Sequence, residues 1–89
     1  MTKGEYKVGI DFNPSQDDVV GRIKRLAADF IDLVDSIEVL VPAEEGGADD
    51  TVQMWTQVQE KGRLKAEAMT EIELAAMWAV KAATKGVPK

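Results

Sequence analysis

Apolar side chains recur along residues 16–41 at intervals of four and three, the spacing that places them on one side of an α-helix. This first apolar seam, an a/d heptad pattern, consists of Val19, Ile23, Leu26, Phe30, Leu33, Ile37 and Leu40. A second apolar line beside it consists of Val20, Ala27, Val34 and Val41. Because the combined face is wider than one neighbouring helix covers, we expect this helix to contact at least two others.

Both ends of this predicted helix carry boundary signals. Ser15 precedes Asp17 and Asp18, so a hydroxyl can cap the free amides while two carboxylates face the positive end of the helix dipole. Pro42 ends the helix because proline cannot continue it. The pattern therefore predicts a first helix over residues 16–41.

A second helix is predicted over residues 51–85. The sequence PAEEGGADD at 42–50 has turn and surface composition, and Asp50 or Thr51 then provides a helix cap. Gly86 marks the end of the helix. A connection this short makes the two helices antiparallel neighbours in a hairpin.

The second helix also carries apolar residues on more than one face. Its seam is made largely of small side chains: Trp55, Val58, Gly62, Ala66, Met69, Ile72, Ala76, Val80 and Ala83. A different face presents Leu64, Ala68, Ala75, Trp78 and Ala82. Two helices cannot bury three apolar faces, so the sequence predicts an obligate homo-oligomer.

The N-terminal segment has a different periodicity. Apolar and polar residues alternate from Tyr6 to Phe12, which is typical of a strand, and Asn13 with Pro14 ends the pattern. With no second strand to pair with, residues 1–14 are predicted to form an extended arm, followed by the hairpin domain over 15–89. The predicted fold class is thus all-α: a two-helix antiparallel hairpin with an extended arm.

Composition excludes most enzyme chemistries. The 89 residues contain no cysteine and no histidine, which removes thiolate nucleophiles, imidazole bases and ordinary zinc sites. A formal net charge of −5 disfavours sequence-independent DNA binding, and no apolar run is long enough for a membrane span. We expect a cytoplasmic, non-enzymatic protein without metal or cofactor, in which any anionic ligand meets a local basic cluster.

Such a cluster is predicted at one end of the hairpin. The antiparallel arrangement brings Lys24 and its neighbours Arg22 and Arg25 level with Lys81 and Lys85, and the arm starts from the same end. Cations beside aromatic rings suit a compact ligand that carries phosphates and planar bases. The residues alone favour the simpler interpretation, in which these cations solvate helix surfaces and balance nearby acids, and leave ligand binding as the alternative.

Trp78 and Lys81 lie one helical turn apart. A tryptophan among alanines is more often a packing anchor than a ligand platform, so we interpret Trp78 as core or interface packing. Lys81 is close enough for a cation–π contact with its ring, for binding an anion, or for stabilising the helix C-terminus.

The segment RLKAEAMTEIELAAMWAVKAAT, residues 63–84, resembles a family of small phage proteins, and FNPSQDDVVGRIKRLAADFIDLVD, residues 12–35, is similar to that family's first helix. These helical-hairpin sponges counter the bacterial CBASS and Thoeris defences by sequestering cyclic nucleotide signals. The resemblance implies a helical oligomer, commonly a hexamer, that binds cyclic dinucleotides between subunits without cleaving them. Some members also hold cyclic trinucleotides at separate sites.

The resemblance also implies roles for particular residues. Tyr6, or Phe12 in its place, would stack on a base, and Lys24 would pair with a phosphate. Arg63 and Thr70 would be polar contacts from the second helix, whereas Lys81 either contacts ligand or packs. The alternative, from another functional class, is a structural or regulatory helical oligomer of phage origin with no small ligand.

Overall fold

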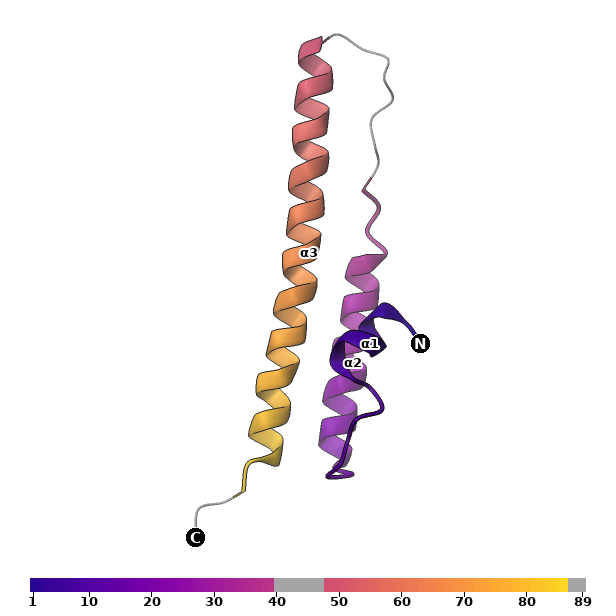
Figure 1. Ribbon diagram of the computed structural model, residues 1–89, viewed down its shortest axis with the longest axis vertical. Helices are drawn as coiled ribbons and strands as arrows, with labels where there is room; N and C mark the ends of the chain where they lie inside the picture. Colours follow the sequence, from indigo (N-terminus) through magenta and orange to yellow (C-terminus); the bar gives the residue numbers. More distant parts are fainter. Residues whose placement is uncertain (40–47, 87–89) are drawn as a thin grey trace.

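The computed structural model describes residues 1–39 and 48–86, and this part of the chain is helical, without strands (Figure 1). Helix α1 spans Lys3–Val8, α2 spans Asp18–Asp35 and α3 spans Ala48–Thr84. Figure 1 shows α2 and α3 side by side and antiparallel, with α1 packed on α2. The predicted all-helical hairpin is therefore confirmed. Its turn, at residues 40–47, lies outside the described residues.

Helix α2 is shorter at both ends than the predicted range of 16–41. Asp17, rather than Ser15, is the N-cap, and its side chain accepts a 2.8 Å hydrogen bond from the amide of Val19. At the other end Ser36 is the C-cap, and its hydroxyl donates to the Leu33 carbonyl at 2.6 Å. A serine hydroxyl that donates to a carbonyl of the preceding turn competes with the backbone hydrogen bonds that continue a helix. The apolar heptad pattern nevertheless continues beyond Ser36.

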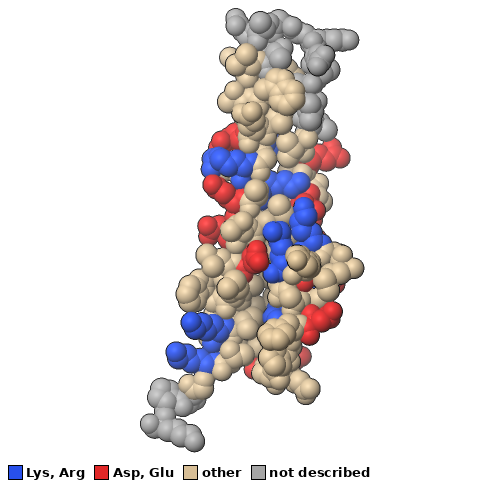
Figure 2. Space-filling view, viewed as in Figure 1, with Lys and Arg blue, Asp and Glu red and all other residues tan. Residues whose placement is uncertain are grey.

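Helix α3 begins at Ala48, before the predicted caps at Asp50 and Thr51, and extends well beyond the end of α2. The ammonium of Lys65 donates to the carbonyl of Ile37 at 3.0 Å, so residue 65 is level with the end of α2. Residues 52–59 of the protruding part carry no charge, and the corresponding upper region of Figure 2 is uncharged on the visible face. About 24 Å of α3 thus has no helical neighbour among the described residues.

The core lies where all three helices meet. Ile31 and Val34 of α2 pack against Met69 of α3, and Val8 of α1 contacts the same cluster. Ile31 is 0% exposed. This core is small for an 89-residue chain, because a two-layer arrangement of helices offers little interior.

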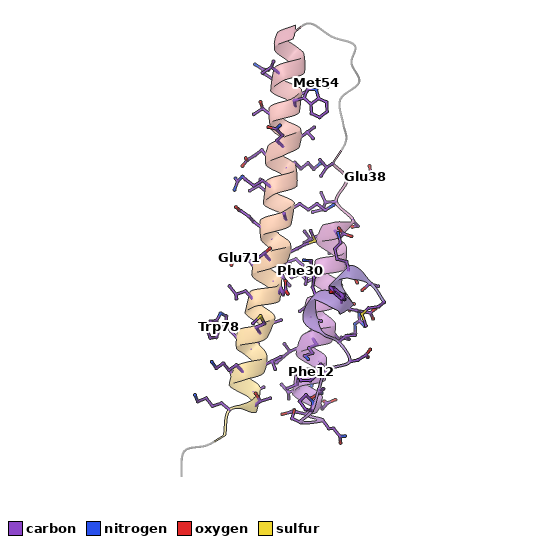
Figure 3. The ribbon with its side chains drawn as sticks, in the orientation of Figure 1. Phe12, Phe30, Glu38, Met54, Glu71 and Trp78 are labelled. Carbon is purple, nitrogen blue, oxygen red and sulfur yellow. The ribbon has the colours of Figure 1, made fainter. Side chains whose placement is uncertain are left out.

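The first apolar seam of α2 is largely exposed in the single chain. Its members Leu26 and Leu33 are 71% and 68% exposed, and Phe30, labelled between α2 and α3 in Figure 3, is also exposed. The second apolar line is buried instead at Val20 and Val34, and Val34 packs against Met69 of α3. The hairpin therefore buries the smaller apolar face and leaves the larger one on its surface.

The predicted extended arm is wrong, because residues 3–8 form helix α1. Thr2 and Glu5 make a capping box: the Thr2 hydroxyl accepts from the Glu5 amide, and the Glu5 carboxylate accepts from the Thr2 amide. Gly9 ends the helix in the left-handed region at φ 63°. The alternating pattern from Tyr6 onward concealed this signal, which lies at residues 2–5.

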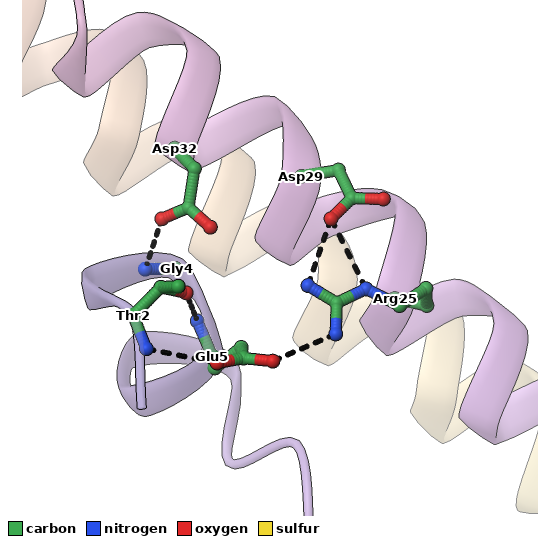
Figure 4. Close-up of polar contacts among 6 residues, drawn as sticks. All are labelled: Thr2, Gly4, Glu5, Arg25, Asp29 and Asp32. Atoms are coloured by element: carbon green, nitrogen blue, oxygen red, sulfur yellow. Dashed lines mark hydrogen bonds and ion pairs between the residues drawn. The ribbon is translucent and has the colours of Figure 1, made fainter.

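Helix α1 is held on α2 by close packing and polar contacts (Figure 4). The amide of Gly4 donates to the Asp32 carboxylate at 2.7 Å, and a Cβ at Gly4 would lie closer than 3.0 Å to the Ala28 carbonyl oxygen. Arg25 bridges the Glu5 carboxylate at 2.8 Å and the Asp29 carboxylate at 2.7 Å. These contacts fix α1 in one place relative to α2.

Candidate functional site: a lysine-lined cavity between the three helices

A cavity of about 380 Å³ opens between the end of α1, the start of α2 and the end of α3. Each helix contributes one lysine to its wall: Lys7 from α1, Lys24 from α2 and Lys81 from α3. The remaining wall is formed by Val8, Glu73, Ala76, Met77, Val80 and Thr84. The volume falls within the range typical of small-molecule sites, about 300 to 1,000 Å³.

Lys24 is the most buried of the three lysines, at 7% exposure. Its ammonium donates to the backbone carbonyl of Gly9 at 2.9 Å and to that of Phe12, and it lies 5.4 Å from the centre of the Phe12 ring. No carboxylate of the described residues lies within ion-pair distance of it. The Lys24 ammonium has three N–H donors, and the two carbonyls use two of them. Because this buried charge has no counter-ion, its third N–H favours an anion as acceptor.

The other two lysines reach the cavity from more exposed positions. Lys81 lies with its ammonium 5.5 Å from the centre of the Trp78 ring, a cation–π contact within α3. Trp78 itself is exposed and lies on the side of α3 away from α2 (Figure 3). It is not part of the core of the single chain, so its predicted packing role would have to be met at an interface.

The basic cluster predicted from the antiparallel register forms in part. Lys24 and Lys81 do meet at one cavity. Arg25 instead faces α1: its guanidinium donates hydrogen bonds to the carboxylates of Glu5 on α1 and Asp29 on α2, and these bonds, the one to Glu5 first, raise its pKa. Arg22 is exposed and does not line the cavity. Arg22, Lys24 and Arg25 are close in sequence but face different surroundings, because successive residues of a helix point in different directions.

Tyr6 and Phe12, the predicted stacking rings, flank the cavity without lining it. Tyr6 is largely exposed on α1, next to Lys7. Phe12 is also largely exposed and lies near the start of α2 (Figure 3), with its ring beside the buried Lys24 ammonium. Stacking of Tyr6, or of Phe12 in its place, on a base stays a prediction.

Arg63 and Thr70 do not join this cavity within one chain. They are seven residues apart on α3, and Arg63 lies about 27 Å along the helix from Lys81. The guanidinium of Arg63 is paired with Glu60 and, at 2.9 Å, with Glu67. Its pKa is raised, chiefly by the hydrogen bond to Glu60. Thr70 is exposed. Ligand contact by these two residues stays a prediction, and within one chain they do not line the cavity.

Three polar cavity residues were not identified from the sequence. Lys7 reaches the site because α1 is a docked helix, which the predicted extended arm did not provide. Glu73 and Thr84 lie on the same face of α3 as Lys81, at spacings of eight and three residues. Their spacing from Lys81 could have predicted both as cavity residues, if the face of α3 that carries Lys81 had been assigned to the ligand.

A second, apolar groove of about 310 Å³ lies between α2 and α3. It includes part of the first apolar seam and small side chains of α3: Ile23, Leu26, Ala27, Phe30, Ile72, Ala75, Ala76 and Ala79. Because it lacks charged groups, this groove suits apolar packing rather than an anionic ligand.

The fold and the cavity define a class: a small helical-hairpin binding module whose site is cationic. Residues 5–84 match the Acb2/Tad1 hairpin domain, which covers nearly the whole chain. The chain belongs to this family, the anti-CBASS and anti-Thoeris sponges, and the resemblance seen in the sequence is confirmed. No curated protein and no solved structure matches the chain.

The family is known for sequestering cyclic nucleotides and is a binding domain rather than a known enzyme. Its members are phage-encoded and act in the host cytoplasm. Among the described residues, no helix is both long and apolar enough to cross a membrane.

Proposed function

We propose that this chain binds cyclic dinucleotide immune signals in the lysine-lined cavity and sequesters them intact, blocking bacterial anti-phage signalling. The observation that carries the proposal is the convergence of one lysine from each helix on one cavity, with the buried Lys24 ammonium lacking a carboxylate partner in the described part of the chain. Family membership supplies the ligand class. The proposed setting is the cytoplasm of an infected bacterial cell.

The phosphates would be held by the ammonium groups. Lys24 is fixed by two backbone carbonyls and offers its third N–H, so its position is set before ligand arrives. Lys7 and Lys81 would close on the ligand from opposite helices. Hydrogen bonds to charged groups contribute about 1.5 to 3 kcal/mol each, and a preorganised site loses less of that to ordering.

One base would stack on Tyr6, or on Phe12 in its place, at the rim of the cavity. Both side chains are exposed. A base that extends outward from a phosphate bound in the cavity could reach either ring. Stacking contributes about 1 to 3 kcal/mol per base. Two phosphate contacts and two stacked bases together approach the −12 kcal/mol of a nanomolar complex.

Arg63 and Thr70 would supply polar contacts from α3 to a ligand site between chains. Both are exposed, and they share a face of α3 about 11 Å apart along the helix. An anion at Arg63 would have to compete with Glu60 and Glu67, so this site would need a second chain to supply further contacts.

We further propose that the chain acts as a homo-oligomer, with a hexamer as the expected state. The exposed first apolar seam of α2 and the apolar groove beside it would be covered by other copies. A ligand enclosed between subunits would be shielded from solvent and from host receptors. Bound ligand would remain intact, because the sequence holds neither histidine nor cysteine to act as base or nucleophile.

A thermal-shift panel tests the proposal. Cyclic dinucleotides, cyclic trinucleotides and cyclic ADP-ribose isomers would each be mixed with the purified protein, and binding to the folded state must raise the unfolding midpoint. The Lys7→Met and Lys81→Met variants should each lose roughly 10- to 100-fold in affinity, as expected for one charge-assisted phosphate contact. Lys85→Met is the matched control, because Lys85 lies four residues from Lys81 and does not line the cavity.

Three results of this experiment lead to three different conclusions. A shift with a cyclic dinucleotide, reduced in Lys7→Met and Lys81→Met but kept in Lys85→Met, supports this site. Equal losses in all three variants would indicate general charge attraction. No shift with any ligand would favour the alternative, a structural or regulatory helical oligomer of phage origin.

A further inference from the structure

One acidic residue stands in the wall of the cationic cavity. Glu73 is half-buried and lines the cavity together with Lys7, Lys24 and Lys81. It takes part in none of the ion pairs among the described residues. A carboxylate here repels an incoming phosphate, so it weakens a site that recognises phosphate alone.

The register of α3 separates this carboxylate from the phosphate-binding end. Glu73 precedes Lys81 by eight residues, which is about 12 Å along the helix. Ala76, Met77 and Val80 line the wall between them and are uncharged. A nucleotide laid along this wall, with its phosphate near Lys81, places its base against an apolar surface and the edge of that base toward Glu73.

The chemistry of a carboxylate specifies which base edge it accepts. An ionised glutamate offers two acceptor oxygens and no donor, so it pairs best with two adjacent N–H groups. Guanine presents such a pair on its Watson–Crick edge, at N1 and at the 2-amino group. Adenine presents an amino group beside the lone pair of N1, and that lone pair faces the second carboxylate oxygen unfavourably.

We infer that Glu73 is a specificity-determining residue that reads the Watson–Crick edge of guanine, so that the cavity selects guanine-containing cyclic dinucleotides over adenine-only ones. The inference deepens the proposed function and rests on it. Glu73 thereby serves as an acceptor for the base while the three lysines serve the phosphate. A bare polyphosphate offers no donor for the carboxylate and gains no contact from it.

Calorimetric titration with three ligands tests the inference: cyclic di-GMP, cyclic di-IMP and cyclic di-AMP. Hypoxanthine keeps N1–H but lacks the 2-amino group, so cyclic di-IMP removes one of the two hydrogen bonds. The native chain should bind cyclic di-GMP roughly 10- to 100-fold more tightly than cyclic di-AMP, with cyclic di-IMP between them. The order guanine, hypoxanthine, adenine is the signature of a paired acceptor.

The Glu73→Gln variant should reverse the preference between guanine and adenine. Glutamine offers one acceptor and one donor, which match the amino group and ring nitrogen of adenine. Glu71→Gln is the matched control, because Glu71 is exposed on the same helix and does not line the cavity. It removes the same charge and should leave the guanine-to-adenine ratio unchanged.

Each other result overturns the inference in a recognisable way. If Glu73→Gln strengthens all three ligands by the same factor, Glu73 is a counter-ion for the lysines and reads no base. If the native chain binds the ligands without base preference, the guanine assignment fails while the proposed function stands. If the native chain binds no cyclic dinucleotide at all, the proposed function fails and takes this inference with it.

Discussion

At the scale of single residues, Gly4 shows how one missing side chain positions a helix. Its amide donates to the Asp32 carboxylate, and its α-carbon lies against the backbone of Ala28. A close approach between two helical backbones needs a residue without a Cβ, whatever its dihedral angles. Through this contact Gly4 sets the position of Lys7, one turn further along α1, in the wall of the cavity.

Substituting Gly4 tests this role. Gly4→Ala forces a Cβ into the Ala28 carbonyl and should lower the free energy of unfolding by about 1 to 3 kcal/mol, as overpacking does. Gly21→Ala is the control: its Cβ would meet the nearest atom, on Asn13, at an ordinary 3.8 Å. Because alanine favours a helix interior, Gly21→Ala should stabilise by about 0.5 to 1 kcal/mol. Urea unfolding at a fixed protein concentration measures both, and equal effects would contradict the packing argument for Gly4.

At the scale of elements, α1 depends on charge as well as packing. The pKa of Glu5 is lowered from 4.5 to about 2, first by the hydrogen bond from Arg25 and then by the amide of Thr2. The hydrogen bond from Lys3 lowers the pKa of Asp35 in the same way. A short helix of six residues is unstable alone, so these contacts to α2 decide whether it forms.

Acidification should therefore release α1. Because the pKa of Glu5 is lower in the folded chain than in the unfolded one, the stabilisation is complete above pH 4.5 and is lost as pH falls toward 2. Amide chemical shifts of Gly4 and Gly9 should move toward random-coil values over this window. In Glu5→Gln this step should be absent or reduced, since glutamine does not titrate. An unchanged transition in that variant would assign the release to another carboxylate.

The sequence predicted the long elements better than the short one. Apolar spacing identified α2 and α3 because each is long enough for a helical period to repeat. Helix α1 could not be found this way: it has six residues, and its contacts to Ala28 and Asp32 depend on tertiary packing. The end of α2 was also misplaced, because the apolar pattern continues through Ser36 although the helix stops there.

The residues of the cavity divide in the same way, into those set by the long helices and those set by tertiary packing. Lys24 and Lys81 were predicted to meet, since the antiparallel register of two long helices is enough to bring them together. Lys7 required the position of α1, and Glu73 required knowledge of which face of α3 borders the cavity. The exposure of the first apolar seam could not be predicted either. Two apolar lines run along α2, and periodicity does not say which of them packs against α3.

At the scale of the whole molecule, the single chain is elongated, with extents of 67 × 26 × 13 Å. Its larger apolar face lies on the surface, through Leu26, Phe30 and Leu33 among others. Monomeric proteins rarely expose a contiguous apolar face of this kind. We expect other copies to cover it.

Two variants distinguish the exposed face from the core. The double substitution Leu26→Gln with Leu33→Gln should weaken association, while helical content stays near native because both side chains are largely exposed in one chain. Ile31→Ala, between them in sequence and fully buried, should cost about 2 to 5 kcal/mol of unfolding free energy. Sedimentation velocity over a range of concentrations reports association. A native chain that sediments as a folded monomer throughout would contradict the oligomer.

The central claim is that the chain captures a cyclic dinucleotide and keeps it intact. Equilibrium dialysis of the purified protein against a mixture of cyclic dinucleotides, followed by heating and mass analysis of what is released, tests it most directly. We expect submicromolar retention of at least one cyclic dinucleotide and its recovery unchanged. Failure to retain any of them, or recovery of linear products, would contradict it.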